Sequence, residues 1–324
     1  MYVSGSSSSS LVQTFKSKLR LTSEVLESAR ETLLKQLAIE DTKELVTDRE
    51  VTEEEIDQVE EEPENELEDG IIVERNILLD AFLKYLENNE GITVKMSLLE
   101  GRVVIHEVPL GIYGIVAGEV TSQMRDWYNR LNVFHERDVI VDRNSTVIPD
   151  GSVQPRDLPR PPAGQGCDKG GVPYPTVVVE VGLSEGLKSL HSKARRYFIP
   201  RTTIQIYIAV KIFNPRRDGT RVLVAFVYER ANPERPILVK SFGTAAMYIS
   251  TLKFFRRRRV PDQDITGVGR HTAPPCNHLG IPIYQINIPA TAIFNGSPTG
   301  IPANLGNGCN IDLYGVQEAF FSIL

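Results

Sequence analysis

The chain of 324 residues is 41% hydrophobic and 24% charged, an ordinary composition for a globular protein with one sizeable core. Its longest apolar runs, 175–181 and 204–210, are far shorter than the ~20 residues that a membrane-spanning helix needs. The amino terminus has no basic segment followed by an apolar one, and the three cysteines are odd in number and widely spaced. The composition therefore argues against a membrane span and a disulfide-rich secreted scaffold, and predicts an intracellular protein of the nucleus or cytoplasm.

The net charge of −6 conceals an uneven distribution along the chain. Between Glu44 and Glu74 there are fifteen acidic residues and one basic residue, Arg49, so the rest of the chain has 35 Lys and Arg against 27 Asp and Glu, or about +8. A basic remainder of this size is compatible with a polyanionic partner. The acidic run is typical of a solvated, disordered linker, and the alternative is an internal mimic of nucleic acid that screens a basic surface.

The first 73 residues are expected to form an acidic arm that is partly helical and partly disordered. A serine-rich leader at 4–10 precedes a segment, 11–39, whose heptad-like apolar spacing predicts a helix or a short coiled coil. Such an arm would supply a surface for a protein partner or for a homodimer. The heptad-like apolar positions are Leu19, Val25, Leu26, Leu33 and Leu37.

Ordered structure is expected from residue 74 to 260, as an α/β domain with a mixed central sheet flanked by helices. After it we expect an irregular extension, 261–324, that packs on the core. The expected ranges are 77–86 (helix), 92–98 and 102–108 (hairpin), 118–131 (helix), 133–141 and 145–148 (strands), 151–175 (loop), 176–181 (strand), 185–198 (helix), and 203–213 and 221–228 (strands).

Two carboxylates stand at the ends of expected strands. Asp150 follows Pro149, and Glu180 lies within the apolar run 176–181, where a buried carboxylate needs a partner or a metal. One or two carboxylates, with waters and a substrate phosphate, are the usual ligands of Mg²⁺. The pair therefore indicates a metal site, and the alternative is a salt bridge at the sheet edge.

Two further residues are candidates for the same site. Glu119 opens the expected helix 118–131, where the helix dipole alone also favours a carboxylate. Lys193 lies at the margin of the apolar stripe of the helix 185–198, from which its ammonium group could reach the strand ends. The alternative for Lys193 is a side chain that extends along the helix flank into solvent.

Three short motifs together resemble the PD-(D/E)XK nuclease superfamily, and among its members the Uma-type restriction endonuclease domain. They are Pro149-Asp150, the strand and turn 177–184, and Lys193-Ala-Arg-Arg-Tyr197, and the resemblance covers about residues 75–228. It implies a restriction-endonuclease-like fold and hydrolysis of DNA phosphodiester bonds with Mg²⁺ or Mn²⁺. It also implies that Glu119, Asp150 and Glu180 bind the metal, and that Asp150, Glu180 and Lys193 are catalytic.

The chain departs from the family pattern at three places. Gly182 stands where the strand motif usually has a lysine, and Ser189 stands where relatives often have an acidic residue. The loop 151–175 separates the two carboxylates further than usual. The first two departures, Gly182 and Ser189, motivate a second hypothesis, in which a catalytically inactive nuclease-like module binds nucleic acid or a protein.

A run of four arginines follows two phenylalanines near the end of the expected domain. The run is Arg256, Arg257, Arg258 and Arg259, and its density indicates either contact with a phosphate backbone or a nuclear-import signal. The alternative is a solvated basic edge. We predict that these arginines bind nucleic acid.

Overall fold

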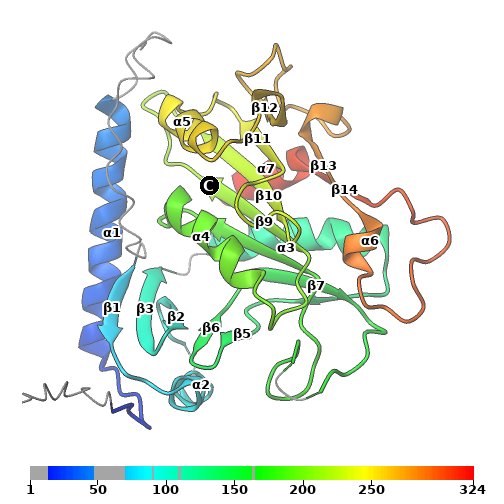
Figure 1. Cartoon of the computed structure of the whole chain (residues 1–324). Coiled ribbons are helices and arrows are strands. Elements are labelled where there is room, and N and C mark those ends of the chain that lie inside the picture. Colours follow the sequence, from blue (N-terminus) through cyan, green and yellow to red (C-terminus); the bar gives the residue numbers. More distant parts are fainter. Residues whose placement is uncertain (1–13, 47–69, 90, 109–110, 163–164) are drawn as a thin grey trace, which may run out of the picture.

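The computed structural model of the protein describes residues 14–46, 70–89, 91–108, 111–162 and 165–324 (Figure 1). It has a mixed α/β fold in which helices flank a large mixed sheet, so the predicted fold class is confirmed. The large sheet has the strand order β12-β11-β10-β9-β8-β7-β4. Its strands are β4 (Leu131–Phe134), β7 (Gly151–Pro155), β8 (Val177–Gly182), β9 (Ile206–Ile212), β10 (Val222–Glu229), β11 (Leu238–Gly243) and β12 (Ile265–Gly267).

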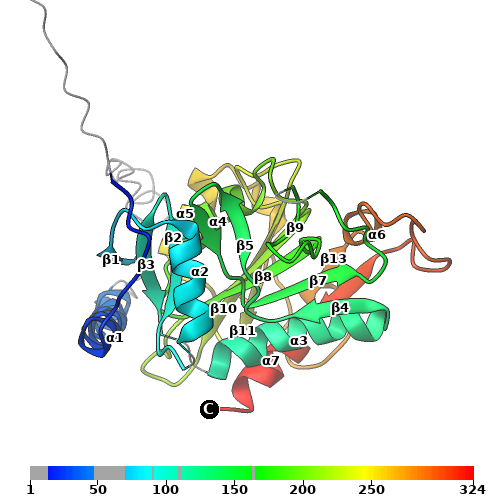
Figure 2. The ribbon, with the colours of Figure 1, turned by 90° about the horizontal axis from the view of Figure 1, so that it is seen from below.

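The centre of the large sheet is buried on both faces. The strands β8 and β9 are parallel, and every residue in both is buried, which explains why their sequences are nearly continuous apolar runs. The helices α3 (Gly111–Trp127) and α7 (Leu313–Phe321) cover one face, and α4 (Leu187–Tyr197) and α5 (Ile249–Arg257) cover the other (Figure 2). Because side chains alternate along a strand, Val179 faces α3 whereas Val178 and Glu180 face α4.

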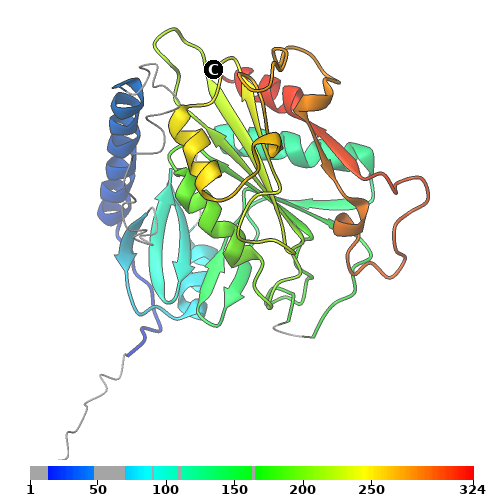
Figure 3. The ribbon, with the colours of Figure 1, turned by 45° about the horizontal axis from the view of Figure 1, so that its top comes forward.

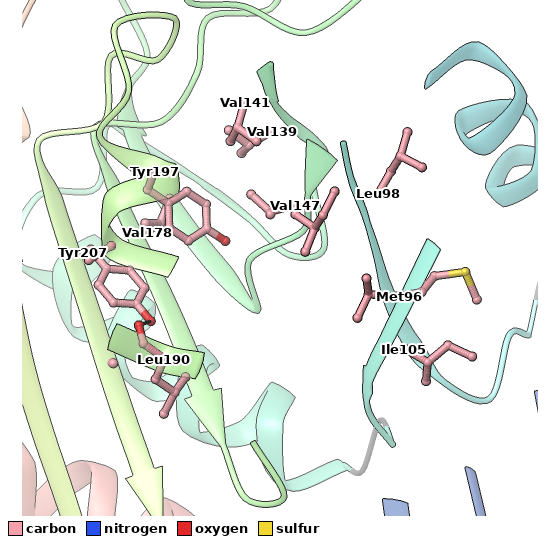
Figure 4. Close-up of a cluster of buried hydrophobic side chains, with 14 of the residues drawn as sticks. Met96, Leu98, Ile105, Val139, Val141, Val147, Val178, Leu190, Tyr197 and Tyr207 are labelled. Carbon is pink, nitrogen blue, oxygen red and sulfur yellow. Dashed lines mark hydrogen bonds between the residues drawn. The ribbon is translucent and has the colours of Figure 1, made fainter. Parts of the chain in front are cut away.

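A smaller sheet, in the order β1-β3-β2-β6-β5, packs beside α4. Its Met96, Leu98 and Val147 share one hydrophobic cluster with Val178 and Tyr197 of the α4 side (Figure 4). The helix α2 (Leu79–Asn88) packs on this sheet, and α1 (Ser23–Val46) lies along its edge. The strands are β1 (Ile71–Glu74), β2 (Lys95–Leu99), β3 (Arg102–Glu107), β5 (Val139–Asp142) and β6 (Ser145–Val147).

Two predicted segments are divided differently in the structure. The expected strand 133–141 is two strands, because β4 pairs with β7 in the large sheet whereas β5 pairs with β6 in the small one. The expected loop 151–175 begins with β7, which pairs with β8. The helix expected at 118–131 is shifted toward the amino terminus and spans Gly111–Trp127, and Leu131 already belongs to β4. The chain therefore passes from the small sheet to the large one at Pro149-Asp150.

The segments at either end of the central region pack on it. Leu19 and Leu33 are buried against the chain's own core, whereas Val25 is 38% exposed. The predicted serine-rich leader and most of the predicted acidic linker lie outside the described residues. None of the described helices combines the length and the apolar character that a membrane span requires.

The segment 261–324 is more regular than the sequence indicates. The strand β12 extends the large sheet in parallel with β11, and α7 packs against α3. A separate two-stranded sheet pairs β13 (Gln285–Ile288) with β14 (Cys309–Asp312). The remaining elements are α6 (Ala290–Ile293) and two short 3-10 helices, Asp262–Asp264 and Pro282–Tyr284.

Candidate functional site

Strand pairing brings Asp150 and Glu180 together. In the antiparallel pair β7–β8, Gly151 lies opposite Val179, so the preceding Asp150 lies beside Glu180. The Asp150 Oδ2 atom accepts a hydrogen bond of 2.7 Å from the backbone N–H of Val181. The carboxylate of Asp150 is therefore fixed against β8, where the two sheets meet.

One lysine bridges these two carboxylates. The Nζ atom of Lys95, at the start of β2, is 2.7 Å from Asp150 Oδ1 and 3.1 Å from Glu180 Oε2. The Nζ atom of Lys193, on α4, is 3.0 Å from the same Glu180 oxygen. The hydroxyl of Tyr197 donates to the other oxygen, Glu180 Oε1. The structure thus brings together three of the predicted site residues, Asp150, Glu180 and Lys193.

Two more carboxylates complete the arrangement. Glu185, just before α4, is 2.7 Å from Lys193 Nζ and accepts a hydrogen bond of 2.6 Å from the hydroxyl of Ser189. Glu107, the last residue of β3, accepts hydrogen bonds from the Leu183 N–H and the Ser184 hydroxyl, whereas its Oε2 atom is buried without a hydrogen-bond partner. We call these residues the buried charge cluster: Lys95, Glu107, Asp150, Glu180, Glu185 and Lys193.

Burial opposes ionisation of every group in the cluster, and the neighbouring charges decide the outcome. Despite burial, Asp150 and Glu180 raise the pKa of Lys95 well above its ordinary value, and Glu180 also raises the pKa of Lys193. The two ammonium groups in turn lower the pKa of Glu180. Burial outweighs the attraction of Lys95 at Asp150, whose pKa is raised, and it raises the pKa of Glu107 to about 7. Both lysines are therefore held as cations within the cluster.

Glu119 lies elsewhere. It belongs to α3, on the opposite face of the large sheet from Lys193, and its Oε1 atom accepts a hydrogen bond of 2.8 Å from the Gln123 side chain. Gln123 in turn accepts a hydrogen bond from the backbone N–H of Asp312, at the end of β14. Glu119 thus stands beside a contact between α3 and the C-terminal region.

The structure explains the absence of a lysine at Gly182. A Cβ atom there would lie 2.9 Å from the Glu185 carbonyl oxygen and 2.9 Å from a methyl group of Leu190. No side chain fits without displacing the backbone that begins α4. Ser189, the second departure from the family pattern, is bound to Glu185 within the cluster.

The residues of the cluster do not fit a divalent cation in this arrangement. Among the described residues, no group of three or more His, Cys, Asp or Glu side chains is placed to hold a metal ion. The position between Asp150 and Glu180 is taken by the Lys95 ammonium group. Glu180 is completely buried, and Asp150 is 7% exposed. The cluster is therefore a set of internal ion pairs.

Sequence reasoning missed Lys95, Glu107 and Glu185. Lys95 and Glu107 border apolar strands, as Glu180 does, so the rule that a buried charge needs a partner applies to them equally. The cross-strand register places Lys95 opposite Glu107 within the small sheet. Packing of that sheet against the α4 side of the large sheet then brings Lys95 to 3.1 Å from Glu180.

A second feature is a large groove beside the cluster. It has a volume of about 1370 Å³ and lies between the β2–β3 turn, α4 and the end of α5. The helices α4 (green) and α5 (yellow) lie side by side in Figure 3. Its lining has three acidic residues, Glu100, Asp142 and Glu234. We call it the basic groove, because nine Arg and Lys residues line it: Arg102, Lys188, Arg195, Arg196, Arg201, Arg235, Arg257, Arg258 and Arg259.

The predicted arginine run divides at this groove. Arg257, Arg258 and Arg259 line it, whereas Arg256 forms an ion pair of 2.9 Å with Asp262. The guanidinium carbon of Arg258 stands 3.6 Å above the ring centre of Phe254, so that side chain is held in place. Three of the four arginines therefore face a concave surface.

Comparison with known proteins gives little beyond this geometry. No family model matches the chain, and no curated protein matches it. Among solved structures, the chain is similar to one from Anabaena variabilis that is described as a "putative nuclease belonging to DUF820". The identity is 18%, the match covers 56% of this chain and 92% of that chain, and the TM-score is 0.35. At this level the likeness assigns neither a family nor a function.

Proposed function

We propose that the protein is a nucleic-acid-binding module on a nuclease-like fold, which binds the phosphodiester backbone of DNA in the basic groove and does not cleave it. The observation that carries the proposal is the charge of the groove. Nine Arg and Lys residues against three Asp and Glu give its lining a formal charge of +6, in a chain whose net charge is −6. A concave surface with this excess concentrates anions and releases the counterions of a bound polyanion.

The residue type and its distribution support a backbone ligand. Eight of the nine cations are arginines, whose planar guanidinium groups match phosphate oxygens in pairs. They come from the β2–β3 turn, from α4, from the loops around residues 201 and 235, and from the end of α5. Because cations from all of these segments line the groove, an extended polyanion lying along it would contact several of them at once.

The buried charge cluster supports binding without hydrolysis. None of its residues lines the groove, and Glu180 is completely buried, so a phosphate in the groove would not contact the carboxylate pair. Ser189 separates the two features, because it lines the groove and donates to Glu185. The Lys95 ammonium group occupies the position between Asp150 and Glu180 that a water-activating metal would need.

A second candidate function is the Mg²⁺- or Mn²⁺-dependent endonuclease that the motifs resemble. One observation favours it: Asp150 and Glu180 converge on a single cation, with Lys193 beside them. The two functions differ in whether a metal is needed and whether the phosphodiester bond is broken.

The test is the salt dependence of DNA binding by wild-type protein and by a groove variant, both in EDTA. Arg257→Ala with Arg259→Ala removes two exposed cations of the groove. We expect weaker binding of single- and double-stranded DNA, and a slope of log K against log salt reduced by ~1.4 and ~1.8 respectively.

The matched control is Arg130→Ala with Arg217→Ala, which removes two exposed arginines outside the groove. It lowers the net charge equally and should leave affinity and slope nearly unchanged. An equal loss in both variants would show that net charge attracts DNA and that the groove is not the binding site. Failure of the wild type to bind either form of DNA would refute the proposal.

A further inference from the structure

We propose that the Lys95 ammonium group is a built-in substitute for a divalent cation, and that its removal opens a metal site formed by Asp150, Glu180 and Glu107. The proposal rests on the proposed lack of catalysis in the cluster and is independent of DNA binding. It concerns the two carboxylates that contact Lys95, Asp150 and Glu180, and the carboxylate of its cross-strand neighbour Glu107.

The geometry places a positive charge where a metal would stand. The Asp150 and Glu180 oxygens that contact Lys95 Nζ are 2.7 and 3.1 Å from it, so they lie at most 5.8 Å apart. A Mg²⁺ ion binds oxygens at ~2.1 Å, so the same two oxygens would bind one ion after moving to within ~4.2 Å of each other. The two oxygens would therefore have to approach each other by at most ~1.6 Å.

A third carboxylate is available on the other side of Lys95. Glu107 lies directly opposite Lys95 in the antiparallel pair β2–β3, and side chains of such pairs are neighbours. Its Oε2 atom is buried and makes no hydrogen bond. With Lys95 removed, the Oε2 atom of Glu107 would be available as a third oxygen ligand for a divalent cation.

The charge balance of the cluster points the same way. Four carboxylates surround two lysines, so loss of Lys95 would leave one ammonium group among four acidic side chains. Unpaired buried carboxylates are strongly destabilising, and a hard divalent cation with oxygen ligands relieves them. In the native protein Lys95 fills this requirement without metal.

Two substitutions of Lys95 distinguish the effect of removing its positive charge from the effect of vacating its side-chain volume. Lys95→Ala removes the ammonium group and vacates its volume, whereas Lys95→Met removes the charge but fills most of the space. Binding of Mn²⁺ is measured by loss of the free-ion electron paramagnetic resonance signal, and stability by thermal melting with Mn²⁺ or EDTA. Neither readout depends on activity.

We expect wild type and Lys95→Met to bind no Mn²⁺ at the cluster. Lys95→Ala should bind one ion, melt at a higher temperature with Mn²⁺ than in EDTA, and lose both properties when Glu180→Gln is added. If Lys95→Ala does not fold in EDTA, recovery of the fold on addition of Mn²⁺ supports the proposal, and Lys95→Ser, whose hydroxyl can donate to a carboxylate, replaces it in the titration.

Three results would overturn the inference. The wild-type protein could bind Mn²⁺, and Asp150→Asn could abolish that binding, which would mean that the Lys95 ammonium group does not occupy the metal position. The folded Ala or Ser variant could bind no Mn²⁺. Alternatively, neither variant could fold with any divalent ion present, in which case the carboxylates cannot accept a metal in place of the lysine. Loss of DNA binding in the groove variants would leave all these readouts unchanged.

Discussion

Replacing Glu180 by Gln tests whether the cluster stabilises the fold. Glu180 is completely buried and accepts from Lys95 at 3.1 Å, from Lys193 at 3.0 Å and from the Tyr197 hydroxyl. Breaking a buried ion pair by neutralising one partner costs ~3–5 kcal/mol, because the other charge stays buried. For a chain of this size that loss lowers the melting temperature by on the order of 10 °C.

The matched control is the same substitution at Glu234, whose ion pair with Arg195 is exposed, with 63% and 54% of the two side chains accessible. An exposed pair is worth about 1 kcal/mol or less. Urea unfolding followed by circular dichroism gives the free energy of unfolding for both variants and the wild type. If Glu180→Gln loses no more than Glu234→Gln, the carboxylate is not part of a buried cluster, and the reasoning fails.

Three further outcomes follow from named contacts. Gly182→Lys should lower the free energy of unfolding in urea by ~1–3 kcal/mol and create no metal site, because a Cβ atom at this position would lie 2.9 Å from atoms of Glu185 and Leu190. A stable Gly182→Lys variant that binds Mn²⁺ would contradict this. Tyr197→Phe should cost ~1–3 kcal/mol by removing the hydroxyl that donates to Glu180, and a neutral effect would show that the bond is unimportant. Burial lowers the pKa of His191 to about 3, so the folded state favours the neutral imidazole, and the stability from this group is present above about pH 6.5 and lost as the pH falls toward 3. The free energy of unfolding of wild type, relative to His191→Leu, should therefore decrease by ~2–3 kcal/mol between about pH 7 and 4.5. A difference that stays constant with pH would refute the assignment.

The sequence predicts best what local pattern determines. The apolar run of β8 and the stripe of α4 place Glu180 and Lys193 on facing elements, and the Pro149-Asp150 pair marks a strand end. The hairpin of β2 and β3 is also where its alternation and turn indicate. These features depend on residues that are close in sequence.

What the sequence did not reveal depends on long-range pairing. Lys95 reaches Glu180 across 85 positions, because the small sheet packs against the α4 side of the large one. Glu119 is on the opposite face, and the helical spacing of α3 says which residues share a side but not which side of the sheet the helix covers. The segment 261–324 contributes β12 and α7 through partners far away in the chain.

The central claim is that the protein binds DNA without cutting it. The most direct measurement follows binding and cleavage of supercoiled plasmid in the same samples, with Mg²⁺, Mn²⁺ or EDTA. We expect equal binding in EDTA and in Mg²⁺ or Mn²⁺ when the ionic strength is matched, and intact plasmid throughout, with Asp150→Ala and Glu180→Ala changing stability only. Metal-dependent nicking that both substitutions abolish in folded protein would contradict the account and establish the endonuclease instead.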